Sequence, residues 1–120
     1  MAMKENSMIE KMLNRYPELK EPYDQECKIL TAVNRKISPY LFFEYVLADA
    51  LKTAIATKNH SLIKGVVHDM ETLCKEDYGY YSDIVITAVF EHFTPEEICE
   101  NFAEYFGICL KRAYAQYTEA

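Results

Sequence analysis

The spacing of the apolar residues, close to 3.6 positions, is the feature that most limits what this chain can fold into. It places the apolar side chains from Ser61 to Lys75 on one helical stripe. From Tyr40 to Thr57, thirteen of eighteen residues are apolar or aromatic. Three glycines and four prolines are too few for the turns of an all-β domain. The sequence therefore predicts an all-α fold in which the helix containing residues 40–57 is the most buried.

Capping signals predict where several helices begin. Ser38-Pro39 and Thr94-Pro95 each place an N-cap hydroxyl before a proline at the first helical position, and Glu97 completes a capping box with Thr94. Asn59 is expected to cap the helix from Ser61 to about Lys75. The other predicted helices are Glu5–Arg15, a looser segment after Pro22, Tyr80–Phe93, and one continuous helix from Pro95 to about Tyr117 that bends at Gly107.

Short connections between these segments predict antiparallel neighbours. We expect one domain over residues 1–120, with residues 1–4 disordered or not native, folded as a compact antiparallel helical bundle. Two successive helix pairs, residues 40–75 and 80–117, suggest HEAT-like stacking. No sequence repeat supports that stacking, so a plain up-down bundle is the alternative.

Charge limits the partners. The formal net charge is −6, which disfavours nucleic acid and anionic lipid. No apolar stretch is long and uncharged enough to cross a bilayer, and the first twelve residues lack the apolar core of a signal peptide. We therefore expect a cytoplasmic protein. The acids are concentrated between residues 69 and 104, where ten Asp and Glu accompany Lys75 alone.

Catalytic signatures are missing from the sequence. The four cysteines lack metal-ligand spacing and fall beside apolar residues, so we expect buried free thiols. The three histidines are not spaced with carboxylates as metal ligands, and His92 is expected to pack on an apolar stripe. No nucleophile-elbow or phosphate-loop motif occurs. We predict no catalytic, cofactor or metal site, although a Cys–His pair distant along the chain is a third possibility.

The acidic second half is the predicted partner-binding region. Glu100 and Glu104 lie beyond the first turn of the predicted last helix, with no Lys or Arg three or four residues away, and like charges at that spacing destabilise a helix. A solvated face is the simpler alternative. Tyrosines near carboxylates are typical of surfaces that bind cationic proteins. The predicted binding residues are Asp77, Tyr78, Tyr80, Tyr81, Asp83, Glu97, Glu100 and Glu104.

Two segments carry a family resemblance. Arg15-Tyr16-Pro17-Glu18-Leu19 and Ser38-Pro39-Tyr40-Leu41-Phe42-Phe43-Glu44, followed by two further helix pairs, resemble small all-α immunity proteins of contact-dependent inhibition and related polymorphic-toxin systems. The resemblance covers roughly residues 8–118. It implies a cytoplasmic protein that binds a cognate toxin domain, often a nuclease, and covers its basic cleft. A helical adaptor or self-associating module without a toxin partner is the alternative.

Overall fold

The computed structural model describes the backbone of residues 2–119 and the side chains of residues 7–118. Every regular element in this range is helical, as the apolar periodicity predicts. Short π-helical and 3₁₀ turns continue or connect the α-helices. The α-helices are α1 (Ala2–Arg15), α2 (Lys20–Ala32), α3 (Pro39–Leu41), α4 (Ala48–Thr57), α5 (His60–Glu76), α6 (Tyr80–Ile84), α7 (Pro95–Asn101) and α8 (Ile108–Glu119).

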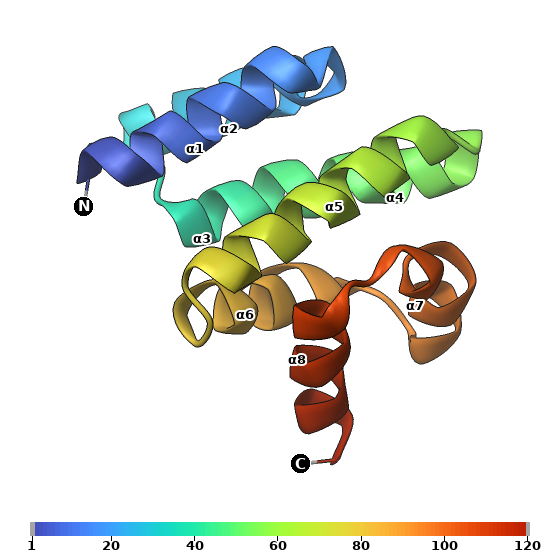
Figure 1. Cartoon of the computed structure of the whole chain (residues 1–120). Helices are drawn as coiled ribbons and strands as arrows, with labels where there is room; N and C mark the ends of the chain where they lie inside the picture. The colour runs from blue at the N-terminus through green and yellow to red at the C-terminus, as the bar shows by residue number, and fades with distance from the viewer. Residues whose placement is uncertain (1, 120) are drawn as a thin grey trace.

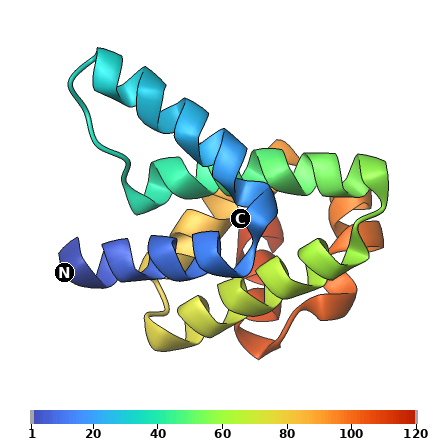
Figure 2. The same ribbon diagram turned by 90° about the horizontal axis from the view of Figure 1, so that it is seen from above.

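The helices are arranged in three tiers. In Figure 1, α1 and α2 form the upper tier, α3, α4 and α5 the middle one, and α6, α7 and α8 the lower one. The expected stacking of helix pairs is therefore visible, but α8 runs across the direction of α5 (Figures 1 and 2). The Cα radius of gyration is 13.8 Å, close to the value of about 13.6 Å expected for a domain of this length. Within the described range, no helix combines the length and the apolar character needed to cross a membrane.

The predicted capping interactions are present. Ser38 Oγ accepts a hydrogen bond from Leu41 N at 3.2 Å, and Asn59 Oδ1 accepts one from Leu62 N at 3.2 Å. These two side chains start α3 and α5. The first helix differs from its prediction, because α1 begins at Ala2 and includes residues for which disorder was expected.

The helix over residues 39–57 supplies much of the core. Its central turn, Phe42–Leu47, is π-helical, so α3 and α4 continue one another through a widened turn. A second π-helical segment, Val85–Val89, follows α6 and contacts the first. The helix over residues 39–57 is predicted to be the most deeply buried. This agrees with five of its side chains, which are fully inaccessible to solvent: Phe42, Phe43, Val46, Leu47 and Leu51.

The prediction of one continuous last helix is wrong. α7 ends at Asn101, a 3₁₀ turn follows over Ala103–Tyr105, and Phe106 is extended, with φ −67° and ψ 132°. α8 then begins at Ile108. In the sequence, the apolar residues before and after this break keep the same helical spacing. The periodicity therefore does not reveal that the helix ends and a new one begins.

Glu71 of α5 provides the physical reason for the break. Its buried carboxylate accepts hydrogen bonds from Cys109 N at 3.0 Å and Leu110 N at 2.9 Å. The first N–H groups of a helix have no partner within the helix, so this carboxylate acts as the N-terminal cap of α8. A Cβ at Gly107 would lie 2.6 Å from Glu71 Oε2. Glycine is therefore needed here for close approach.

We expect Gly107→Ala to lower the free energy of unfolding by about 1–3 kcal/mol, because the added methyl displaces the Glu71 carboxylate from the N–H groups it caps. Urea denaturation followed by far-UV circular dichroism measures this loss. In a Glu71→Ala background the same substitution should cost much less. Equal costs in the two backgrounds would contradict the proposed clash.

Candidate protein-binding surface

α7 and the 3₁₀ turns before and after it carry five glutamates, and we call Glu91, Glu96, Glu97, Glu100 and Glu104 the acidic surface. Thr94 Oγ1 accepts from Glu97 N at 3.1 Å, and Glu97 Oε1 accepts from Thr94 N at 2.9 Å, so the predicted capping box is confirmed. Glu97 is half-buried in this role, while the other four side chains are exposed. The buried ring of Phe102 anchors the end of α7 against Phe93, with ring centroids 5.0 Å apart.

The acidic surface has no cationic partner among residues 7–118. The ion pairs in that range involve Asp24, Glu44 and Asp69 as the acids. No Lys or Arg occurs between Lys75 and Lys111. Glu96 and Glu100 are one turn apart on α7, whereas Glu104 lies in the following 3₁₀ turn. Glu100 and Glu104 therefore do not face one another on one helix, as the sequence predicts. The like-charged pair at helical spacing is Glu96 and Glu100.

A second group of predicted residues lies at the turn between α5 and α6, and we call Asp77, Tyr78, Tyr80 and Asp83 the tyrosine turn. Gly79 has φ +101° and donates its N–H to Ser82 Oγ at 3.0 Å, which starts α6. The hydroxyl of Tyr78 donates to Gln116 Oε1 of α8 at 3.2 Å. All four side chains that define this turn are exposed.

Tyr81 is wrongly predicted as a binding residue. Its side chain is only 3% exposed, and its ring lies 6.5 Å from that of Phe43 in the core. Tyr80, its neighbour, is 42% exposed. Adjacent residues of a helix point about 100° apart, so the start of α6 turns one tyrosine inward and leaves the other at the surface.

The structure does not bring the remaining predicted residues together. The turn that precedes α6 lies at one end of the lower tier and α7 at the other, in both views (Figures 1 and 2). The predicted site is therefore two separate surfaces. The acidic surface carries Glu97, Glu100 and Glu104, and the tyrosine turn carries Asp77, Tyr78, Tyr80 and Asp83.

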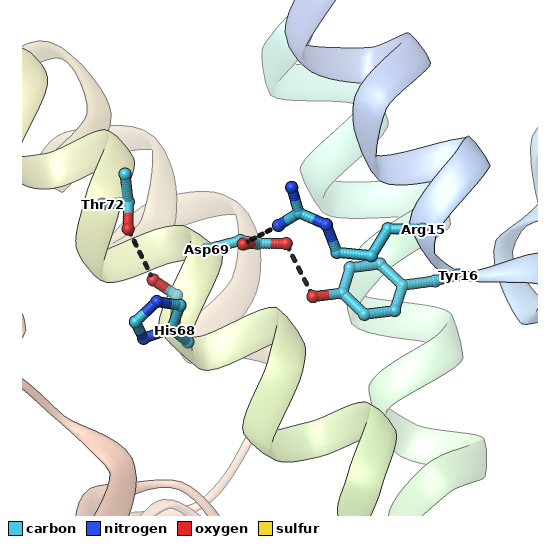
Figure 3. Close-up of polar contacts among 5 residues, drawn as sticks. All are labelled: Arg15, Tyr16, His68, Asp69 and Thr72. Atoms are coloured by element: carbon cyan, nitrogen blue, oxygen red, sulfur yellow. Dashed lines mark hydrogen bonds and ion pairs between the residues drawn. The ribbon is translucent and has the colours of Figure 1, made fainter.

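Two acids of the sequence cluster are internal. Glu71 caps α8, and Asp69 is buried between α5 and the end of α1. Asp69 Oδ1 accepts from the Arg15 guanidinium, and Asp69 Oδ2 accepts from the Tyr16 hydroxyl at 2.6 Å (Figure 3). Burial, then the bond to Asp69, raises the pKa of Tyr16, so the phenol stays protonated and remains a donor. The sequence did contain a sign that Asp69 is buried, because it lies three residues after Val66 and therefore close to the apolar stripe of α5.

Cavities flank this cluster on both sides of Arg15. One of about 340 Å³ is bordered by Lys11, Met12 and Thr72, and one of about 550 Å³ by Lys64, His68 and Tyr105. Both oxygens of Asp69 already accept hydrogen bonds. The cluster therefore acts as a tie between α1 and α5, and Gly65 allows it, because a Cβ there would lie 2.8 Å from the Tyr16 hydroxyl.

The candidate metal ligands and thiols can be placed among the described residues. No group of three His, Cys, Asp or Glu in that range could hold a metal ion. The side chain of His92, expected to be a partly buried packing residue, is 34% exposed, and its Nε2 lies 3.3 Å from Glu44 Oε2. The four cysteines are free, but only Cys74 is buried and Cys99 is exposed, which corrects the expectation of four buried thiols.

Comparison with known families gives one match. Residues 9–119 match a family described as Domain of unknown function (DUF7674). The chain belongs to this family. Neither the curated proteins nor the solved structures give a significant match. The match to the DUF7674 family begins within α1 and includes both predicted surfaces, and its description assigns no activity to either.

Thiol reactivity should follow burial. Near pH 8 we expect iodoacetamide to modify Cys99 quickly and Cys74 only after unfolding, because burial, and then the charges of Glu71 and Cys109, raise the pKa of Cys74 to about 12. The thiolate is the reactive form, and about one Cys74 thiol in ten thousand is then ionised. Mass spectrometry of proteolytic fragments locates the adducts. Rapid native labelling of Cys74 would contradict the burial and restore it as a candidate nucleophile.

Proposed function

We propose that this domain is an interaction module that binds a basic protein through the acidic surface. The observation that carries the proposal is the succession of Glu91, Glu96, Glu97, Glu100 and Glu104 along α7 and the turns on either side of it. Four of the five are exposed, and none forms an ion pair among the described side chains. Glu96 and Glu100 repel one another in the free chain, and a cationic partner relieves that repulsion.

The surface is suited to fast and selective capture. Uncompensated charge of one sign steers an oppositely charged partner and raises the association rate, with the largest effect at low salt. The capping box and the packed ring of Phe102 fix α7, so little ordering is needed on binding. The same charge repels nucleic acid, which leaves a protein as the partner.

The specific role that we propose is that of a cytoplasmic immunity protein. It rests on the resemblance of Arg15–Leu19 and Ser38–Glu44 to immunity proteins of polymorphic-toxin systems, together with the acidity of α7. A nuclease toxin binds phosphates in a basic cleft, and a surface of carboxylates would occupy the same cleft. In this role the chain performs no catalysis and needs no cofactor.

The alternative is a helical adaptor or a self-associating module, and the tyrosine turn favours it. Tyr78 and Tyr80 are 39% and 42% exposed, and exposed tyrosines often form the centre of protein interfaces. Sedimentation equilibrium separates the alternatives, since a stable homodimer that is lost on Tyr78→Ala and Tyr80→Ala substitution would support self-association through this turn.

Charge reversal tests the proposed surface. Glu100→Lys with Glu104→Lys should weaken binding to a cognate toxin domain by at least about tenfold, because each reversal replaces an attraction with a repulsion. Survival of cells that co-express the two proteins, and surface plasmon resonance at low and high salt, measure the effect. The matched control is Asp77→Lys with Asp83→Lys, which makes the same charge change at the opposite end of the lower tier.

The two double variants discriminate between the surfaces. Loss in the α7 variant with retention in the control supports the acidic surface. The reverse pattern would place the interface at the tyrosine turn, and retention in both would overturn the proposal. Circular dichroism of each variant checks that the fold is intact.

A further inference from the structure

The exposed side of α5 carries a hydroxyl and two basic side chains at helical spacing. Ser61, Lys64 and His68 are three and four residues apart, so their side chains fall within about 60° of arc around the helix axis. All three side chains are exposed. No acid occurs from residue 50 to residue 68, although the protein has a net charge of −6. This side of α5 is therefore a basic area on an acidic protein.

These three side chains border a cavity between α5 and the end of α1. The volume of the cavity is about 550 Å³, and Arg15 and Tyr16 line it from α1. Tyr105, in the 3₁₀ turn after α7, also lines it. The hydrogen bonds from Arg15 and Tyr16 to Asp69 (Figure 3) hold α1 against α5. The helices on the two sides of the cavity therefore have a fixed separation.

The basic side chains of this cavity are not neutralised from within it. Asp69 is the only acid among the described residues that line the cavity. Both of its oxygens accept hydrogen bonds, from Arg15 and Tyr16, and the charge of Arg15 offsets its own. Neither Lys64 nor His68 forms an ion pair among the described side chains. Their charge is therefore available to a ligand.

One acid lies just outside the lining. Glu104 is beside the Tyr105 hydroxyl, at the edge of the cavity that the 3₁₀ turn forms. A negative charge at this edge disfavours an extended polyanion that would cross it. A compact anion held between α5 and α1 is compatible with it.

We propose that this cavity binds a phosphate-type oxyanion, either free phosphate or the terminal group of a small phosphomonoester. Lys64 and His68 supply positive charge, and the hydroxyl of Ser61 donates a hydrogen bond from the same side of α5. Arg15 contributes from α1, because a guanidinium has five N–H groups and Asp69 accepts from Nη1. Hydrogen bonds from cations to a phosphate dianion are among the stronger ones in proteins. This site does not depend on the binding of a protein at the acidic surface.

Other ligands fit this cavity less well. A metal cation would be repelled by Lys64 and Arg15, and it would find the carboxylate of Asp69 already engaged. A single carboxylate group carries one negative charge, which is too little for the basic side chains on both helices. Nucleic acid is repelled by the net charge of the protein and needs a longer row of cations.

Calorimetric titration tests the proposal. The probes are inorganic phosphate and glucose 6-phosphate at about pH 6.5, where an ordinary histidine is partly protonated and a phosphomonoester is largely dianionic. We expect saturable binding of both, and none of glucose. Tighter binding of glucose 6-phosphate would identify a phosphomonoester as the ligand, whereas equal or tighter binding of phosphate would identify the free anion.

A matched pair of variants locates the binding. Lys64→Gln with His68→Gln should weaken binding of both probes by at least about tenfold, because each change removes a cation and keeps a polar side chain. The control is Lys58→Gln with His60→Gln, which removes the same two residue types at exposed positions outside the lining. It should change the affinity by less than about twofold. The melting temperature of each variant without ligand checks that the fold is intact.

Nuclear magnetic resonance supplies a measurement that needs no substitution. On titration with phosphate, the amide signals of Lys64, Gly65 and His68 should shift more than those of the rest of α5. Absence of saturable binding, shifts confined to other residues, or equal weakening in the two variants would overturn the proposal. So would a glutamate-rich peptide that binds through Lys64 and His68 when phosphate does not.

Discussion

Two buried carboxylates on α5 hold the tiers of this fold together. Asp69 and Glu71 are two residues apart, so their side chains point about 200° from one another around the helix axis. Asp69 accepts from Arg15 and Tyr16 at the end of α1, and Glu71 accepts from the first N–H groups of α8. A buried carboxylate is costly unless donors surround it, so each of these groups favours one position of its neighbouring helix. The middle tier thereby sets the placement of the tiers above and below it.

The parts of this fold that depend on local signals could be predicted from the sequence. Ser38, Asn59 and Thr94 each bond to a backbone N–H three residues later, and the starts of these three helices were predicted correctly. The start of α8 could not be predicted from the sequence, because its cap is Glu71, which lies 38 residues before the Cys109 N–H that it accepts from. In the candidate site too, features set by local sequence could be predicted, and features set by distant residues could not. Exposure of Glu100 and Glu104 follows from helical phase, whereas burial of Tyr81 depends on Phe43, which the residues around Gly79 do not reveal.

Charge is distributed unevenly over this fold, because residues 69–104 carry ten acids and Lys75 as their only Lys or Arg, whereas residues 27–43 carry no acid. The proposed acidic surface lies on and around the short helix α7 in the lower tier, whereas the stretch without acids runs from the end of α2 in the upper tier to the start of the helix containing α3 and α4 in the middle tier (Figure 1). Segregated charge gives the domain an electrical polarity, which orients a charged partner before contact.

The cap that α8 receives from α5 also bears on how the chain is made. An isolated helix of twelve residues is marginal in water, and α8 borrows its N-terminal partner from a helix synthesised much earlier. While the ribosome still covers α8, the carboxylate of Glu71 lacks these two donors and must remain hydrated. The part of α5 that packs against α8 is therefore covered only after α8 has emerged.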